Sequence, residues 1–226
     1  MPKTKVCPRD ATHVTSEPTA ARCAICEAEL VEVGQPSAGG HKVEFVFVID
    51  GTGSMSGEIS YVKENLTYLA DLLRANQHDP KLGMVVFRDF DYDGDKALET
   101  FELSHDAAAF AERVKNIAAQ GGGDAPEHAL DGLLQACRLF QDADAKRCMM
   151  LITDAPTKPA RDGQDTKGVA GVLRQHRVLL QAVVGNKDDW KDLTLNPRTY
   201  VYDLASRDRH AMDDTLSRIV GTIVKA

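Results

Sequence analysis

The stretch VEFVFVIDGTGSMS at residues 43–56 decides the fold of this chain. Residues 43–49 are almost all β-branched or aromatic, which is typical of a strand that is buried on both faces of a sheet. The strand ends at Asp50, and residues 50–56 are mostly small and polar. In α/β proteins, ligands bind just beyond the carboxyl ends of such strands. The residues that follow each strand are therefore the first candidates for a functional site.

Apolar strand patterns alternate with helical patterns along the rest of the chain. Six strands interleaved with helices predict an α/β, Rossmann-like domain, whose mostly parallel six-stranded sheet is flanked by helices. The alternating pattern at 98–103 predicts an edge strand. Strands are predicted at 43–49, 82–87, 98–103, 148–153, 178–184 and 200–204. Helices are predicted at 57–76, 106–119, 126–140, 166–176 and 208–225.

The composition is that of a globular protein with one sizeable core, because 43% of its 226 residues are hydrophobic. Asp and Glu outnumber Lys and Arg by 34 to 27. Nucleic acids and anionic membranes attract basic proteins, so neither is an expected partner. No apolar run approaches the roughly 20 residues that cross a bilayer. The start MPKTKVC lacks the apolar stretch of a secretory signal. We therefore expect a cytoplasmic protein.

Three parts are distinguishable along the chain. Residues 1–33 contain three of the five cysteines, residues 34–41 are small and glycine-rich, and residues 42–226 carry the strand and helix patterns. The middle part is typical of a flexible linker. The other two cysteines, Cys137 and Cys148, lie in apolar runs and are predicted to be buried.

Oxygen-bearing side chains follow two of the predicted strands. Asp50, Thr52 and Ser54 alternate after the first strand, and Asp154 follows the strand at 148–153. A third loop contributes Asp124, in the sequence GGGDAPE at residues 121–127. Because these loops meet at one edge of the sheet, the five side chains are expected to lie together. Carboxylates and hydroxyls without Cys or His suit Mg²⁺, Mn²⁺ or Ca²⁺.

This pattern resembles the metal-ion-dependent adhesion site of the von Willebrand factor type A family. The usual family motif is Asp-x-Ser-x-Ser, with a Thr in a second loop and an Asp in a third. The resemblance covers about residues 42–226. It implies that Thr52 and Ser54 supply hydroxyl oxygens, while Asp50 and Asp154 bind the ion directly or through water. An open coordination position would take an acidic side chain from a protein partner.

One position departs from the family pattern. Either Ala125 takes the place of the second-loop Thr, or Asp124 supplies a replacement oxygen. If Asp124 coordinates, three carboxylates surround the ion, which favours the ion and disfavours a partner's carboxylate. The loop at 121–127 also resembles a bacterial and protist branch of the family, which includes domains associated with alpha-type kinases. The resemblance therefore implies that the chain belongs to a bacterial branch of the family with an intracellular role.

The function implied by the resemblance is non-enzymatic: a metal-dependent protein–protein interaction module in an intracellular assembly. Relatives act with kinases, phosphatases or ATPases in stress, metal-resistance or defence systems, so such components are expected partners. Two alternatives stay open, namely a metal-dependent phosphohydrolase and a nucleic-acid adaptor led by the N-terminal segment. A nucleophilic serine would need a histidine base, and His128 is the histidine nearest to a strand-end loop.

The acidic segment DFDYDGD at residues 89–95 is a second candidate feature. It matches the start of an EF-hand calcium loop, but Thr100 stands where that loop needs a bidentate Glu. The segment is predicted to be a solvated hairpin turn. The alternative is a loop that lines the metal site, in which Arg88 and Asp89 could contact a partner.

The N-terminal part resembles a zinc ribbon, in which two pairs of ligands hold the ion. Cys23 and Cys26 are spaced as one such pair, and Cys7 with Asp10 has the same spacing. A structural zinc takes four ligands, and a 33-residue unit with few apolar residues needs such a metal to fold. We predict Zn²⁺ on Cys7, Cys23, Cys26 and His13, with Asp10 as the alternative to His13.

Overall fold

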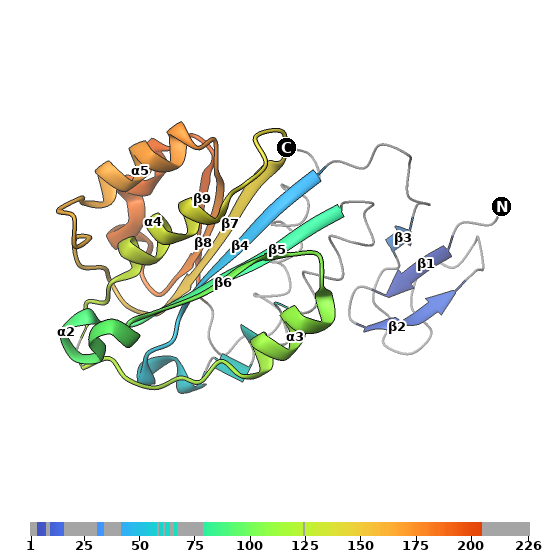
Figure 1. The fold of residues 1–226 in the computed structure, drawn as a ribbon, viewed down its shortest axis with the longest axis horizontal. Coiled ribbons are helices and arrows are strands. Elements are labelled where there is room, and N and C mark those ends of the chain that lie inside the picture. Colours follow the sequence, from blue (N-terminus) through green and yellow to red (C-terminus); the bar gives the residue numbers. More distant parts are fainter. Residues whose placement is uncertain are drawn as a thin grey trace.

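The computed structural model describes residues 4–7, 10–15, 31–33, 42–57, 59–60, 62–63, 66, 79–123 and 125–204, with the backbone alone before residue 42. Its main feature is a six-stranded sheet in the order β6-β5-β4-β7-β8-β9 (Figure 1). The strands are β4 (Lys42–Asp50), β5 (Asp79–Phe87), β6 (Leu98–Ser104), β7 (Lys146–Thr153), β8 (Leu179–Val184) and β9 (Thr199–Asp203).

The predicted α/β class and mostly parallel sheet are confirmed. Each neighbouring pair is parallel except β5 and β6, and β6 lies at an edge of the sheet, as predicted. β4 pairs with β5 on one side and with β7 on the other. Along the chain, β5 and β6 are placed on one side of β4, and β7, β8 and β9 on the other. In open α/β sheets, ligand sites form where the strand order reverses in this way.

Three of the predicted helices are described in full and are shorter than predicted. They are α3 (Ala107–Lys115), α4 (Ala129–Leu139) and α5 (Thr166–Gln175). Side-chain caps fix two of their starts, because Asp106 and Asp165 each accept a backbone N–H at 2.9 Å. Of the helix predicted at 57–76, the residues described after Gly57 are Ile59, Ser60, Val62, Lys63 and Leu66, all of them helical. The helix predicted at 208–225 lies outside the described residues.

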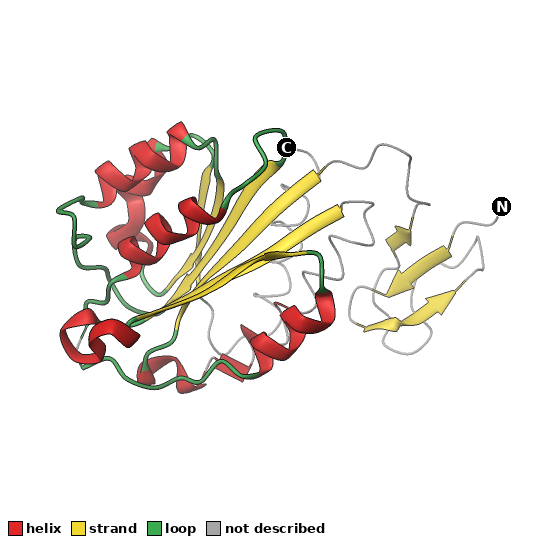
Figure 2. Cartoon of the chain, in the orientation of Figure 1, coloured by secondary structure: helices red, strands yellow, loops and turns green. Residues whose placement is uncertain are grey.

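Helices cover both faces of the sheet (Figure 2), and the core accordingly has two layers. Phe45, Phe47 and Ile49 belong to one layer, together with residues of α3 and the helical residues at 59–66. Val46 and Val48 belong to the other layer, together with residues of α4 and α5. Because β4 is covered on both faces, its sequence is apolar without alternation. Burying each large apolar side chain contributes about 1.5–3 kcal/mol, and this packing holds the ends of β4 and β7 in place.

The two remaining cysteines are buried, as predicted, and burial raises the pKa of the Cys137 and Cys148 thiols to about 12. In the N-terminal part, β1 (Thr4–Cys7), β2 (Asp10–Thr15) and β3 (Val31–Val33) form an antiparallel sheet in the order β2-β1-β3. Cys7 and Asp10 are register partners. Cys23 and Cys26 lie outside the described residues, so the zinc site stays a prediction. No helix in the described part combines the length and apolar character needed to cross a membrane.

Candidate functional site

Asp50 is the buried centre of the site. Its side chain is fully buried at the end of β4. One carboxylate oxygen accepts the backbone N–H of Thr52 at 2.9 Å and the Thr52 hydroxyl at 2.6 Å. The other oxygen accepts the hydroxyl of Thr153, the last residue of β7, at 2.6 Å. Asp50 is therefore held between two parallel strands and the loop that follows the first of them.

The loop after β4 turns as a short 3-10 helix, η1 (Gly53–Gly57), because Met55 points into the core and is fully buried. This turn brings Thr52 Oγ1 within 3.0 Å of Ser54 Oγ. Ser54 Oγ in turn donates to Asp154 Oδ1 at 3.0 Å. The predicted side chains Asp50, Thr52, Ser54 and Asp154 thus form one continuous chain of contacts.

Two hydroxyl hydrogens are shared among three close oxygen–oxygen contacts. Each hydroxyl has one hydrogen. Thr52 Oγ1 can donate to Asp50 and Ser54 Oγ to Asp154, and either can donate across the 3.0 Å that separates the two hydroxyl oxygens. One of the three contacts therefore lacks a hydrogen, whichever way the hydroxyl groups turn. A cation that accepts electron pairs from both oxygens would turn this unfavourable contact into a favourable one.

Glu127 was missed by sequence reasoning and belongs beside these residues. Its side chain is 4% exposed, and Oε2 has no hydrogen-bond partner in the described part of the protein. A Cβ on Gly122 would lie 2.9 Å from Thr52 Cγ2 and 3.1 Å from Glu127 Oε1, so both side chains crowd the same glycine. Asp124 lies outside the described residues, and Ala125 is exposed. The described second-loop side chain that reaches the cluster is therefore the carboxylate of Glu127.

Acidic side chains dominate the described part of this cluster. Burial raises the pKa of Glu127 to about 7, and the charges of Asp50 and Asp89 add to this effect. Burial also raises the pKa of Asp50, although its hydrogen bonds oppose the shift. Within the described ranges, no Lys, Arg or His forms an ion pair with Asp50, Glu127 or Asp154. The charge of Asp154 also contributes to the raised pKa of Asp50.

Backbone hydrogen bonds attach Glu127 to the loop that follows β7. The N–H of Glu127 donates to Pro156 O at 3.0 Å, and the N–H of Lys158 donates to Glu127 O at 2.7 Å. These bonds form an isolated parallel bridge between Glu127 and Thr157. The loops that carry Glu127 and Asp154 therefore form one connected unit.

A second acidic cluster lies near the first. Ligand atoms of Asp89, Asp91 and His128 all lie within 4.8 Å of one another. Lys158 Nζ contacts Asp89 Oδ2 at 2.7 Å and Asp91 Oδ2 at 2.6 Å. His128 Nδ1 lies 3.0 Å from Asp89 Oδ1. This cluster already contains a cation, the ammonium group of Lys158. No motif indicated that Lys158 pairs with residues about 70 positions earlier.

The segment at 89–95 connects the antiparallel strands β5 and β6 and is largely exposed, as predicted, but Asp89 is buried and the turn is helical. It forms α2 (Phe90–Asp93) and begins the 3-10 helix η2 (Gly94–Lys96), because Asp89 Oδ1 accepts the backbone N–H of Asp91 and caps the turn. The alternative, a loop that lines the site, agrees with the 2.8 Å hydrogen bond from Gly122 N–H to Asp93 Oδ2. Both the Arg88 and the Asp89 side chain are buried, which disfavours the direct partner contact that this alternative allowed.

The chain matches the family model for the von Willebrand factor A domain over residues 44–214. It is 29% identical over 116 residues to the alpha-protein kinase vwkA of Dictyostelium discoideum. That match covers 50% of this chain and 18% of the kinase, so most of the kinase has no counterpart in the match.

Two solved structures share the fold at low sequence identity. BatB of Bacteroides thetaiotaomicron superimposes with a TM-score of 0.61 at 16% identity, covering 81% of this chain and 98% of BatB. The pilus adhesin SpaC of Lactobacillus rhamnosus GG gives 0.62 at 15% identity, covering 87% of this chain and 31% of SpaC. Together with the family match over most of the sequence, the sheet and its strand-end residues lead to one conclusion: the chain belongs to the von Willebrand factor A domain family.

Proposed function

We propose that this protein is a non-enzymatic interaction module that binds one divalent cation and presents it to a protein partner. The ion is Mg²⁺, with Mn²⁺ or Ca²⁺ as substitutes, because all candidate ligands are hard oxygen atoms. Asp50, Thr52, Ser54, Asp154 and Glu127 would hold it, and the partner would supply a further oxygen. Asp124 remains a sixth candidate.

The observation that carries this proposal is the contact between Thr52 Oγ1 and Ser54 Oγ. These oxygens are 3.0 Å apart, and their two hydrogens have to serve three contacts, since each hydroxyl also contacts a carboxylate. Close to Thr52, Glu127 adds a buried carboxylate oxygen that has no hydrogen-bond partner among the described residues. Unpartnered buried oxygens are costly. A divalent cation would satisfy these electron pairs and offset the repulsion among the three carboxylates.

The partner is proposed to be a component of an intracellular, cytoplasmic assembly that includes a kinase, phosphatase or ATPase. The similarity to a protein named as an alpha-protein kinase supports the first of these. The net charge of −7 supports a protein partner over nucleic acid or an anionic membrane.

Calorimetric titration of the EDTA-treated protein with Mn²⁺ tests the ion site. We expect one ion per chain for the wild type and clearly weaker binding for Asp154→Ala, with an unchanged circular dichroism spectrum. Asp188→Asn serves as the control, because it removes one negative charge from an exposed position of the 3-10 helix η3 (Lys187–Leu195). Equal Mn²⁺ affinity in Asp154→Ala and the wild type would contradict the site.

Two further assays separate the proposed function from its alternatives. Retention of a cell-extract protein with Mg²⁺, but not with EDTA or with Asp154→Ala, supports partner bridging. Mg²⁺-dependent hydrolysis of p-nitrophenyl phosphate that is lost in Asp50→Asn would instead favour a phosphohydrolase. Salt-sensitive binding of DNA or RNA would favour the nucleic-acid adaptor.

The N-terminal part is proposed to be a zinc ribbon with Cys7, Cys23, Cys26 and either His13 or Asp10 as ligands. The antiparallel register places the backbones of Cys7 and Asp10 opposite each other, which supports the first ligand pair. Elemental analysis should find one zinc per chain. A loss of zinc in His13→Ala but not in Asp10→Ala would identify the fourth ligand, and the opposite result would assign it to Asp10.

A further inference from the structure

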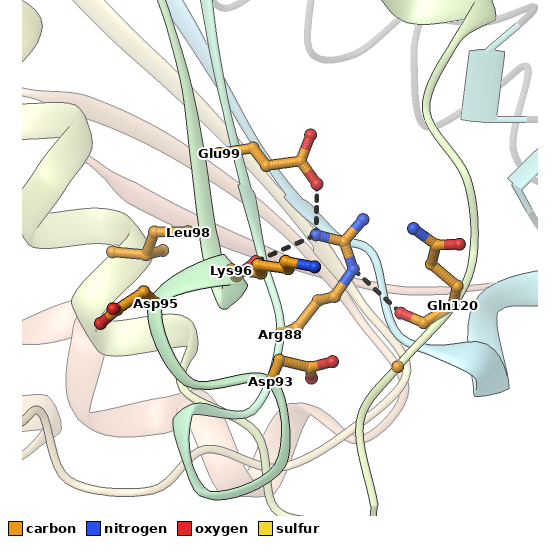
Figure 3. Close-up of a pocket in the computed structure, with 8 residues that line it drawn as sticks. Arg88, Asp93, Asp95, Lys96, Leu98, Glu99 and Gln120 are labelled. Carbon is orange, nitrogen blue, oxygen red and sulfur yellow. Dashed lines mark hydrogen bonds and ion pairs between the residues drawn. The ribbon is translucent and has the colours of Figure 1, made fainter.

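Arg88 follows β5 directly and is 4% exposed, although it carries a permanent charge. Burying a guanidinium group without partners is strongly unfavourable, so its N–H groups must find acceptors. Figure 3 shows the side chain between the segment at 93–99 and Gln120, at a cavity of about 480 Å³. The acceptors of its N–H groups show what this arginine connects.

One side of the guanidinium group binds the backbone next to the proposed ion site. Arg88 Nε donates to Gly51 O at 3.1 Å and to Gln120 O at 2.9 Å. Nη2 donates to Ala118 O at 3.3 Å. Gly51 directly follows Asp50, and Gln120 directly precedes the glycine run at 121–123. Arg88 therefore ties the loop of Asp50 to the segment that leads to Glu127.

The other side of the guanidinium group forms an ion pair with Glu99 of β6 (Figure 3). Nη1 also approaches Lys96 O at 3.5 Å. The Glu99 side chain is 48% exposed, so solvent reaches this half of the ion pair. The pair holds the guanidinium group in the orientation that faces Gly51 and Gln120.

The packing around Gly51 requires a residue without a side chain. A Cβ there would lie 2.5 Å from Val86 Cγ1 and 3.2 Å from Arg88 Cζ. Direct backbone bonds complete the connection between the two loops. Gln120 N–H donates to Gly51 O at 2.9 Å, and Gly53 N–H donates to Gly121 O at 3.1 Å. Gly51 O thus accepts from both Arg88 and the second loop.

We propose that Arg88 is a positioning residue that sets the spacing between the Asp50–Ser54 loop and the Gln120–Glu127 segment, and through this spacing the affinity for the divalent cation. Its hydrogen bonds in the described part of the protein go to backbone carbonyls and to Glu99, and none goes to a proposed ligand. This inference rests on the proposed ion site. A purely structural role would instead predict lower stability with unchanged affinity for the ion.

Calorimetric titration with Mn²⁺ tests the proposal, with the thermal unfolding midpoint in EDTA measured in parallel. Arg88→Ala should weaken Mn²⁺ binding about tenfold, the low end of the range for residues that act through other groups at metal sites. Arg147→Ala is the matched control. Arg147 is a half-buried arginine at the start of β7, where it donates to the carbonyls of Asp142 and His176. It should lose stability and keep its affinity for Mn²⁺ within about twofold.

Chemical rescue distinguishes positioning from general destabilisation. The cavity beside Arg88 gives a small cation access to the vacated position, so millimolar guanidinium chloride should restore part of the Mn²⁺ affinity of Arg88→Ala. The same salt should have no such effect on Arg147→Ala. If Arg88→Ala does not fold, Glu99→Gln replaces it, because this half-exposed side chain can change without burying a charge. A two- to threefold loss of Mn²⁺ affinity is then expected.

The outcomes separate the two proposals. Wild-type protein that binds no Mn²⁺ overturns the proposed ion site, and the role of Arg88 falls with it. Wild-type binding with an unchanged Mn²⁺ affinity in Arg88→Ala, or in Glu99→Gln where that variant is used, leaves the site intact and overturns the positioning role. Weaker binding without rescue by guanidinium also contradicts positioning through this group.

Discussion

The two acidic clusters at the carboxyl edge of the sheet differ in their charge balance. In the cluster of Asp89 and Asp91, the ammonium group of Lys158 contacts both carboxylates within 2.7 Å. In the cluster of Asp50, Glu127 and Asp154, no described basic side chain makes an ion pair. Lys158 holds the pKa of Asp89 below its usual value, despite burial, whereas the pKa of Glu127 is raised to about 7.

This contrast shows how one edge of a sheet can have two electrostatic roles. In the Lys158 cluster, the ammonium group offsets one of the two carboxylate charges and contacts both carboxylates, so it stabilises the loops without any ligand. In the Asp50 cluster, no basic side chain of the described residues forms an ion pair, so holding the carboxylates close together costs folding free energy until a cation binds. Variants that remove or supply charge in either cluster test this difference.

Asp50→Asn should have the largest effect. It removes the carboxylate charge at the centre of the Asp50 cluster with little change in shape. We expect Mn²⁺ affinity to fall by more than about 100-fold, beyond the usual range for residues outside the ligand set. Titration calorimetry measures this loss, with Asp188→Asn as the control for the removal of one negative charge. Binding within tenfold of the wild type would show that Asp50 is not a ligand.

Lys158→Met should leave the carboxylates of Asp89 and Asp91 without their counter-ion. The buried carboxylate of Asp89 loses its counter-ion, so the free energy of unfolding should fall by about 3 kcal/mol. Urea unfolding at pH 7.5 in EDTA measures the change. Lys167→Met, which removes an exposed lysine 4.0 Å from Asp192, should cost less than about 1 kcal/mol.

Adding Mn²⁺ to Lys158→Met sharpens the comparison. The ligand atoms of Asp89, Asp91 and His128 lie within 4.8 Å of one another, so an ion can take the place of the ammonium group. A second bound Mn²⁺ that recovers part of the lost stability is expected. A variant as stable as the wild type in EDTA would show that Lys158 is not the internal counter-ion.

Glu127→Gln should weaken ion binding and stabilise the metal-free protein. Folding raises the pKa of Glu127 from 4.5 to about 7, so between these values the folded protein binds more protons than the unfolded chain. The contribution of Glu127 to the free energy of unfolding therefore falls as pH rises through this window. Without metal at pH 8, the neutral glutamine should stabilise the protein by about 2 kcal/mol.

Urea unfolding in EDTA at pH 5 and pH 8 measures the effect of Glu127→Gln. The loss of stability between the two pH values should be smaller in the variant, and Mn²⁺ affinity should fall about tenfold or more. Glu112→Gln, an exposed change on α3, is the control. An unchanged pH dependence would mean that Glu127 stays ionised and has a partner outside the described residues.

Ser54→Ala should have the smallest effect. It removes an exposed hydroxyl oxygen next to Thr52 Oγ1 and leaves the charged residues in place. We expect Mn²⁺ binding to weaken about three- to tenfold, which corresponds to about 1 kcal/mol. Ser56→Ala, two residues further along the same turn, should have no effect on calorimetric titrations. Equal losses in both variants would argue against a specific role for Ser54.

The sequence allowed the sheet and four of the five described site residues to be predicted. The run at 43–49 is apolar because both faces of β4 are covered, and this signal is local. Asp50 and Asp154 could be predicted because each lies at or just beyond the end of such a strand, and Thr52 and Ser54 alternate after Asp50. The grouping of these four residues needs only the rule that parallel strands end at the same edge.

The rest of the site depends on contacts between distant segments. Glu127 follows a proline at the approach to a helix, a position that usually faces solvent, and its burial comes from the bridge to Thr157. Lys158 meets Asp89 across 69 positions, and Arg88 joins carbonyls of two other loops. No spacing in the sequence predicts these contacts, because they form only when three loops pack together.

Lys158 has a further consequence, since it belongs to both clusters at once. Its backbone is bonded to Glu127, while its side chain reaches α2, whose Tyr92 is 61% exposed. An ion that shifts the Glu127 carboxylate would therefore also shift α2, which carries Tyr92. By thermodynamic reciprocity, a protein that binds Tyr92 more tightly when the ion is bound would raise the affinity for the ion. The position of Tyr92 would then depend on whether the ion is bound, although Tyr92 is not a proposed ligand.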